Sequence, residues 1–454
     1  SEGVIATDFG ISRGKTTVPG AVEERNFAEN RLSSELFGNL NRDLSEDFRL
    51  TAILGTYVRQ EESRDTRVGA TSLIEQGLYN ISIRRGVLTG TSPGYRSRLF
   101  SVYGSAGLSF RGWANIEVTG RNDWTSVLAI GNNSYFYPGV SGSLVLSDAI
   151  PALNTSSVIS YLKLRGAWNK TGNADINPYL LAAYLSEPDY TGFPFGSVPG
   201  ISVFNTHYQD ALEPEFISST EAGFEAGFFN NRVNFEATYF YQNNTDQLIS
   251  INLSDATGYP RSYLNAASFI NKGVEMDLNL SPLVRFTDGA VRLRVNATYN
   301  DSEVTSIFNE QDLRELSIGG YVAAGNYAIV GQPAFMLKGT DYFRDDLGRI
   351  IVDPETGEPS SDPNLKNFGR TMPKWILGLN PSVQWKGFNL SALFEHKGGH
   401  MASFFALGND MAWTGVSEAT AYNNREPFIL PNSVVPNPDI DAATIAADPT
   451  NPDY

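Results

Sequence analysis

Hydrophobic and polar residues alternate with a period of two along much of this chain, and residues 224–242, FEAGFFNNRVNFEATYFYQ, show the pattern clearly. Apolar residues occupy every second position on both sides of Asn230 and Asn231. The positions between them include Glu225, Arg232, Asn234 and Glu236. Successive side chains of a β-strand point to opposite faces, and Asn tolerates the left-handed backbone of a tight hairpin. The stretch therefore predicts two strands and a short turn, with one apolar and one polar face.

The same alternation predicts about a dozen strands along the chain. They cover residues 31–42, 46–60, 98–110, 112–124, 134–147, 158–169, 219–229, 232–245, 269–281, 289–300, 372–385 and 388–396. Many of these segments are far longer than the five or six residues at which strands of globular proteins cluster. Long strands of this kind suit a tilted path across a bilayer.

Short and long connections between these strands largely alternate, which places the long connections at one end of the strands. The expected long loops cover about 61–97, 170–218, 246–268, 301–371 and 397–454, and residues 340–365 predict a hairpin within a loop. Short turns at one end and long loops at the other are typical of outer-membrane barrels. Aromatic residues near strand ends, such as Trp113, Trp124 and Trp385, favour the same interpretation. A soluble β-sandwich has the same alternation and stays open as an alternative.

Composition narrows the classes of protein further. The chain has 454 residues, no cysteine and a formal net charge of −16, with 21 Tyr and 27 Phe. The negative charge excludes a basic nucleic-acid-binding surface, and the missing cysteines exclude disulfides and thiolate sites. No apolar run reaches the length of a transmembrane helix, and the first residues contain no signal peptide. The expected fold is all-β, an antiparallel transmembrane barrel.

A series of motifs in order then resembles one family. They are TGRNDWTSVL at 119–128, SYFYPGVSGSLVLSD at 134–148, YLKLRGAWNKTGN at 161–173, LEPEFISSTEAGFEAGFFNNRVNFEATYFYQNNTDQLI at 212–249, NKGVEMDLNLSP at 271–282, VGQPAFMLKGTDYFRDDLGRIIVD at 330–353 and GFNLSALFEHKGG at 387–399. Together they resemble the SusC/RagA family of TonB-dependent outer-membrane transporters over most of residues 30–440. The resemblance implies a large plugged barrel of about 22 strands.

The resemblance also implies partners and a location. Such a protein imports glycan or peptide cargo across the cell outer membrane, beneath a SusD-like surface lipoprotein, and receives energy from the TonB complex through an N-terminal part. Outer-membrane lipid surrounds it, and no cofactor is implied. The sequence shows no TonB box, plug domain or closing strands, so the dozen strands predict part of a longer polypeptide with one barrel domain over 1–454.

Candidate chemical sites are weak. His396 and His400 have a metal-ligand spacing only if they lie on a helix, which Gly398 and Gly399 oppose. An acidic group lacks the spacing of a Ca²⁺ loop and predicts solvated turns, so whether a loop binds Ca²⁺ stays open; it comprises Asp341, Asp345, Asp346 and Asp353. Glu213 and Glu215 could be paired carboxylates, but they are interpreted as leading into a strand. The sequence therefore predicts no catalytic residue, no metal site and no enzyme.

Two groups of residues are candidates for contacts. The polar strand positions expected to line the lumen or contact a plug are Lys163, Arg165, Arg232, Glu236, Arg292 and Arg294. Loop aromatics that could hold cargo or a partner, or simply pack within the loops, are Tyr190, Phe193, Tyr208, Tyr321, Trp413 and Tyr422. The predicted function is TonB-dependent nutrient import. The alternatives are a passive porin or a secretion or assembly barrel, and a soluble carbohydrate-binding protein or glycosidase.

Overall fold

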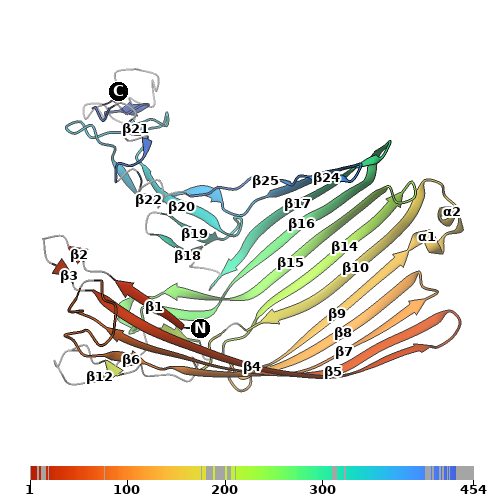
Figure 1. The fold of residues 1–454 in the computed structure, drawn as a ribbon, viewed down its shortest axis with the longest axis horizontal. Helices are drawn as coiled ribbons and strands as arrows, with labels where there is room; N and C mark the ends of the chain where they lie inside the picture. Colours follow the sequence, from red (N-terminus) through yellow and green to blue (C-terminus); the bar gives the residue numbers. More distant parts are fainter. Residues whose placement is uncertain are drawn as a thin grey trace. The chain divides into compact units, whose positions relative to one another are not determined.

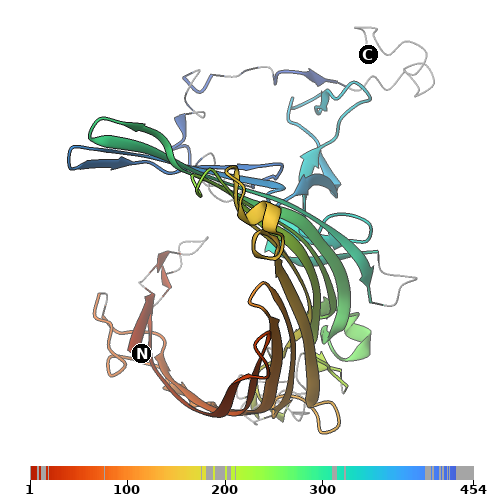
Figure 2. The same cartoon turned by 90° about the vertical axis from the view of Figure 1, so that its right-hand side faces the viewer.

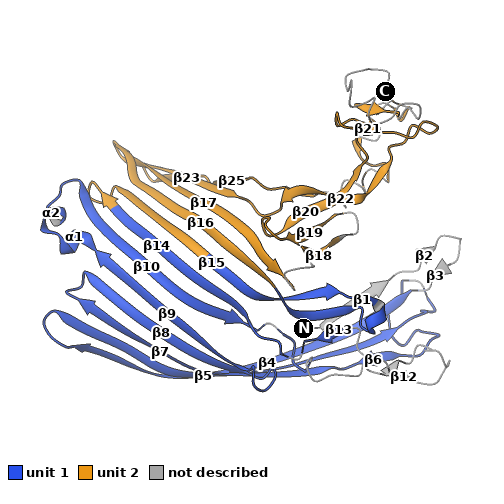
Figure 3. Ribbon diagram, turned by 180° about the vertical axis from the view of Figure 1, so that it is seen from behind, with its two compact units in different colours: residues 1–226, 242–266 blue, residues 227–241, 267–454 orange. Residues whose placement is uncertain are grey.

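The computed structural model describes residues 2–435 apart from several gaps. These gaps are 8–9, 12–16, 19, 76, 175, 180–187, 190–199, 202–205, 210, 309–313, 322–323, 404–410, 412–413, 419–420, 422–423, 427 and 429. The chain forms two compact units, residues 1–226 with 242–266 and residues 227–241 with 267–454 (Figure 3). Among the residues described, no helix is both long enough and apolar enough to cross a bilayer.

Unit 1 is built on long antiparallel strands that lie side by side in the order β1-β4-β5-β7-β8-β9-β10-β14 (Figure 1). Their bounds are β1 Glu2–Thr7, β4 Ala21–Asp43, β5 Phe48–Ala70, β7 Gly94–Phe110, β8 Ala114–Thr125, β9 Ser134–Val145, β10 Ile159–Asn173 and β14 Glu215–Phe228. Figure 2 shows β4 to β10, coloured red to yellow, following a curved sheet. The long strands in sheet order are nearly all sequence neighbours, so their connections alternate between the two ends of the sheet.

Smaller elements fill the connections of unit 1. They are β2 Gly10–Ile11, β3 Thr17–Val18, β6 Thr89–Thr91, α1 Leu146–Ala149, α2 Pro151–Asn154, β11 Pro188–Asp189, β12 Gly200–Ile201, β13 Thr206–Tyr208 and the 3-10 helix η2 Asp255–Thr257. Strand β13 pairs in parallel with residues 261–263, which begin β16. This pairing ties the loop before β14 to the edge of a long strand.

Unit 2 contains the antiparallel strands β16 Arg261–Phe286, β17 Gly289–Ile307 and β23 Trp375–Trp385, apart from the first residues of β16. Strand β15, Val233–Asn252, contributes residues to both units. Both β24 Phe388–Ser391 and β25 Phe394–Gly398 pair with β23. A separate sheet has the order β18-β19-β20-β22 and comprises β18 Glu315–Tyr321, β19 Ala324–Ile329, β20 Met336–Tyr342 and β22 Ser361–Arg370. The short strands β21 Ile350–Ile351 and β26 Ser433–Val434 pair in parallel.

Backbone geometry explains the short turns. Asn230 and Asn231 both have positive φ, 57° and 59°, as the hairpin prediction requires, but Phe229 also has positive φ, 54°, so the loop between β14 and β15 covers four residues, 229–232. Lys386 and Gly387, the two residues between β23 and β24, also have positive φ. Positive φ at both central residues is the signature of a type I′ turn, whose twist matches that of the flanking strands.

All twelve predicted strands are present, but several extend further into the long loops than the alternation indicates. Strand β5 continues to Ala70 instead of residue 60, and β4 begins at Ala21 instead of residue 31. Charged residues pair across the strands in these extensions and next to them: Arg25 contacts Asp65 at 2.8 Å, and Arg31, at the predicted start of its strand, contacts Glu61 at 2.6 Å. Such cross-strand ion pairs stabilise the pairing of β4 with β5 where the two strands present no apolar face. The expected loops are therefore shorter than the sequence pattern suggests.

The last predicted strand, 388–396, is interrupted. The structure divides it into β24 and β25, with Ala392 and Leu393 between them. Pro381 lies on the paired strand at this point and has no N–H to donate, although its carbonyl still accepts from Ala392 N at 3.1 Å. The missing donor explains the break.

Candidate functional site

The sheet of unit 1 has one polar face and one apolar face. The register places Ser101 opposite Asp123, and Tyr103 opposite Arg121, so these side chains share a face. The alternate residues of β8, such as Val118 and Gly120, belong to the other face. We call the first surface the polar face and the second the apolar face of unit 1.

Arg121 organises the centre of the polar face. Its Nε donates to Asp123 Oδ1 at 2.6 Å, and its Nη2 donates to Ser101 Oγ at 2.8 Å. The guanidinium carbon lies 5.8 Å from the centroid of the Tyr57 ring, and Ser101 is 0% exposed. Three strands are thus linked through one cation. The sequence contains a signal for this site, an Arg and an Asp two positions apart in a strand, although neither residue is among the predicted contact residues.

Tyr103 extends this surface onto β5. Its hydroxyl donates to Glu35 Oε1 at 2.5 Å, and its ring lies over Gly55. A Cβ at Gly55 would come within 2.5 Å of the ring. The glycine therefore makes room for an aromatic side chain that crosses the strand, a device that also pins register.

Lys163 and Arg165 meet around one carboxylate. Lys163 Nζ lies 3.1 Å from Glu225 Oε1, and Arg165 Nε lies 4.0 Å from the same oxygen. Lys163 is 62 residues and Arg165 is 60 residues from Glu225 in sequence, and the sheet brings the three side chains together.

The other four predicted lumen residues lie elsewhere. Arg294 pairs with Asp277 at 2.8 Å, and Arg292 donates to Gln384 Oε1 at 3.2 Å. Arg232 Nη2 donates to the carbonyl of Pro282 at 3.3 Å. Glu236 is partly buried on β15. These four residues belong to unit 2, whereas Lys163 and Arg165 share Glu225 in unit 1.

Of the loop aromatics, Tyr208 can be placed. It lies on β13 with its ring 5.7 Å from that of Tyr263, packed on the buried residues Leu128, Ile176 and Leu212. Its ring therefore helps to hold the loops together. The side chains of Tyr190, Phe193, Tyr321, Trp413 and Tyr422 lie outside the described residues.

The carboxylates Glu213 and Glu215 serve the loop and the start of β14. Glu215 Oε1 accepts the backbone N–H of Leu248 at 2.9 Å, and the backbone of Glu213 bonds to Asn265. His396 lies on strand β25 and His400 follows it, so no helix brings the two imidazoles to one face. Within the described part of the chain, no three His, Cys, Asp or Glu residues are grouped to hold a metal ion.

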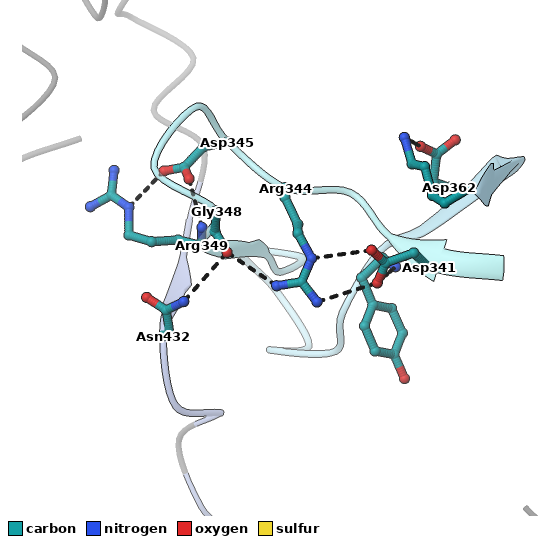
Figure 4. A network of polar contacts seen from close by, with 9 residues as sticks. Asp341, Arg344, Asp345, Gly348, Arg349, Asp362 and Asn432 are labelled. Atoms are coloured by element: carbon teal, nitrogen blue, oxygen red, sulfur yellow. Dashed lines mark hydrogen bonds and ion pairs between the residues drawn. The ribbon is translucent and has the colours of Figure 1, made fainter. Parts of the chain in front are cut away.

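Three acidic residues of β20 and the loop after it, Asp341, Asp345 and Asp353, have protein partners, and Figure 4 shows those of Asp341 and Asp345. Arg344 donates to both oxygens of Asp341, at 3.2 and 3.3 Å, and Arg349 Nε donates to Asp345 Oδ2 at 2.6 Å. Asp353 Oδ1 accepts the backbone N–H groups of Glu355 and Thr356. The carboxylates close turns of the segment 340–365, where β20 and β22 form the expected hairpin.

Acidification should loosen this loop. The hydrogen bond from Arg344 holds the pKa of Asp341 below its ordinary value of 3.8. Because the folded state binds this proton more weakly than the unfolded state, the stabilisation is present above about pH 4 and is lost as the pH falls through the lowered pKa. Hydrogen exchange over 341–353, corrected for intrinsic rates, should show weaker protection at about pH 3 than at about pH 6. The Asp341→Asn variant should show a smaller difference, and equal protection at both pH values in the wild type would contradict the prediction.

The fold and these surfaces define a class of protein. Long antiparallel strands, one charged face, one apolar face and connections that alternate between ends are the features of a transmembrane β-barrel. The family model of the "TonB dependent receptor-like, beta-barrel" matches residues 6–431. The chain belongs to this family, which confirms the fold class.

Similar proteins agree with this assignment. TonB-dependent receptor P26 of Formosa agariphila is 24% identical over 382 residues, covering 78% of this chain and 37% of the relative. TonB-dependent receptor SusC of Bacteroides thetaiotaomicron is 23% identical over 349 residues, covering 74% and 35%. The structure of the RagAB peptide transporter superimposes with a TM-score of 0.70 at 20% identity, covering 84% of this chain and 42% of that one. The resemblance to the SusC/RagA family is thereby confirmed, and the chain spans less than two-fifths of the length of these two curated relatives.

Proposed function

We propose that this chain forms part of the barrel wall and the loops of a TonB-dependent importer in the cell outer membrane. The observation that carries the proposal is the sheet of unit 1, with the Arg121 network on one face and apolar residues on the other, in a chain of the TonB-dependent receptor family. A hydrocarbon exterior and a polar interior reverse the usual pattern of a soluble protein. Membership of this family supports the proposal over the soluble sandwich and the glycosidase.

The cargo class is an oligosaccharide or a peptide. The relatives are named SusC and, for the solved structure, a peptide transporter. The polar face offers both charges, at Arg121 and Glu225, and aromatic rings at Tyr57 and Tyr103, which suit either class. We further propose that a SusD-like surface lipoprotein covers the long-loop side and that the TonB complex supplies the energy. In this scheme the residues of the chain bind and guide cargo and perform no covalent chemistry.

Growth and uptake by the organism test the proposal. A strain without the full-length gene should lose uptake of at least one labelled oligosaccharide or peptide, and the gene restored on a plasmid should recover it. Uptake should fall to the level of the deleted strain when TonB is removed or the proton gradient is collapsed. Uptake that persists without TonB would identify a passive porin instead, and hydrolysis of the cargo by the purified protein would overturn the transport-only role.

A further inference from the structure

We propose that the apolar face of unit 1 carries a seat for one acyl chain of a phospholipid, at a groove across β7, β8, β9 and β10. The inference rests on the proposed function, because it takes the apolar face to lie in the bilayer. The groove has a volume of about 650 Å³. Its apolar lining includes Leu108, Ile116, Val140, Leu144, Leu164 and Trp168.

The register explains why a groove forms at this position. Ile116 lies opposite Gly142, and Gly142 lies opposite Gly166. Two neighbouring strands therefore lack a side chain at the same level of the apolar face. On one side of this level Leu144 lies opposite Leu164, and on the other Val140 lies opposite Trp168. The two glycines form a floor between two apolar walls.

The backbone does not require glycine at either position. Neither Gly142 nor Gly166 has a positive φ. A Cβ at Gly142 would lie 3.4 Å from the carbonyl oxygen of Asn115, and a Cβ at Gly166 would lie 3.6 Å from that of Glu221. A side chain fits at both positions, so what the glycines provide is the depth of the groove.

The groove lies beside a ring cluster at the short-turn end of the sheet. The Phe110 ring packs at a tilt of 43° against Phe48, with centroids 4.9 Å apart, and meets Trp113 edge-on at 5.4 Å between centroids. Leu108, at the edge of the groove, is only two residues along β7 from Phe110, a rise of roughly 7 Å. Aromatic girdles mark the interface of outer-membrane barrels, and the short turns face the periplasm. The ring cluster thus sets the groove just inside the hydrocarbon of the periplasmic leaflet.

The level of the groove in the membrane determines which kind of lipid can bind in it. A chain that enters from the periplasmic leaflet belongs to a phospholipid, whose headgroup would lie at the level of the rings and of Arg111. The Arg111 guanidinium lies 5.3 Å from the centroid of Phe110 and pairs with Asp47 at 2.7 Å. A zwitterionic headgroup can meet both members of this exposed pair, with its phosphate at the arginine and its amine at the aspartate. The geometry favours phosphatidylethanolamine-type chemistry over a purely anionic lipid.

Native mass spectrometry of the full-length protein tests the seat. The protein is extracted from the outer membrane in mild detergent and titrated with phosphatidylethanolamine. The wild type should retain one tightly held lipid, and the double variant Gly142→Leu and Gly166→Leu should hold it about tenfold more weakly, because the new side chains fill the groove and remove van der Waals contacts between the acyl chain and the groove. Gly38→Leu is the matched control, since a side chain at Gly38 meets open space on the apolar face of β4. It should leave the lipid in place.

The outcomes separate the seat from the proposed function. If the leucine pair does not reach the outer membrane, the double alanine variant at the same positions should still weaken lipid binding by roughly threefold, because its two added methyl groups displace part of the acyl chain from the floor of the groove. Equal retention in the wild type and in either double variant would overturn the seat, as would a second protein chain found on the groove in place of lipid. Nutrient uptake is measured in the same strains: loss of lipid with uptake intact supports the seat, whereas a wild type that imports nothing refutes the transport role regardless of lipid.

Discussion

Replacement of Gly273 by alanine should lower the free energy of unfolding by about 3 kcal/mol. Gly273 lies on β16, opposite Asn300 of β17, and is buried. A Cβ at this position would overlap the carbonyl oxygen of Tyr299 and come within 2.6 Å of the Phe240 ring. The ring could turn away, but the carbonyl belongs to the hydrogen-bonded backbone of the neighbouring strand, so the two strands would have to separate locally.

Urea unfolding of the full-length barrel in lipid vesicles measures this effect, with the folded fraction followed by gel migration. Gly38→Ala is the control, because a Cβ at Gly38 meets no atom within 4 Å. It should change the stability by no more than about 0.5 kcal/mol, as expected for a substitution without new contacts. If both variants shift the transition equally, the close approach at Gly273 is not what the stability depends on.

Replacement of Asn265 by alanine should free the loop that precedes β14. Asn265 Oδ1 accepts the N–H of Glu213 at 2.9 Å, and its Nδ2 donates to the carbonyls of Glu213 at 2.9 Å and Asp246 at 2.7 Å. Three hydrogen bonds to backbone groups disappear together, each with a net contribution near 1 kcal/mol. The adjacent Leu212 is 0% exposed, so the loop core of Leu128, Ile176 and Leu212 should loosen as well.

Hydrogen exchange measured by mass spectrometry should show the amides of residues 211–215 exchanging about 100-fold faster in Asn265→Ala. The control is Asn80→Ala, since the Asn80 side chain accepts one hydrogen bond, from the N–H of Ser82 at 2.8 Å. Its effect should be confined to its own loop and be several-fold smaller. Unchanged exchange over residues 211–215 in Asn265→Ala would show that β13 alone holds the loop.

Period-two alternation predicted the strands because it reflects a local property of the chain. Residue types alone predicted the strands β14 and β15 and the turn at Asn230 and Asn231 that joins them. The alternation failed at the outer ends of β4 and β5, where the cross-strand ion pairs of Arg25 and Arg31 replace an apolar face. A charge-rich stretch has the same appearance in a loop and in a paired strand, and only the partner strand distinguishes them.

The contacts of the candidate residues depended on sheet order. Alternation places Lys163 and Arg165 on one face, but nothing near them in sequence indicates Glu225 as their partner. In the same way, the break between β24 and β25 follows from Pro381 on the neighbouring strand. Such partners become known only when the register of the strands is known.

The sequence by itself determined the all-β class, the existence of the strands, the residues that share a face within each strand, and the family. The tertiary structure decided which side chains meet between strands: Arg121 with Ser101, Tyr103 over Gly55, and Gly142 beside Gly166. The physical reason is that the direction of a side chain follows from the backbone of its own strand. The neighbours of that side chain follow from register, which is set by hydrogen bonds between segments distant in the chain.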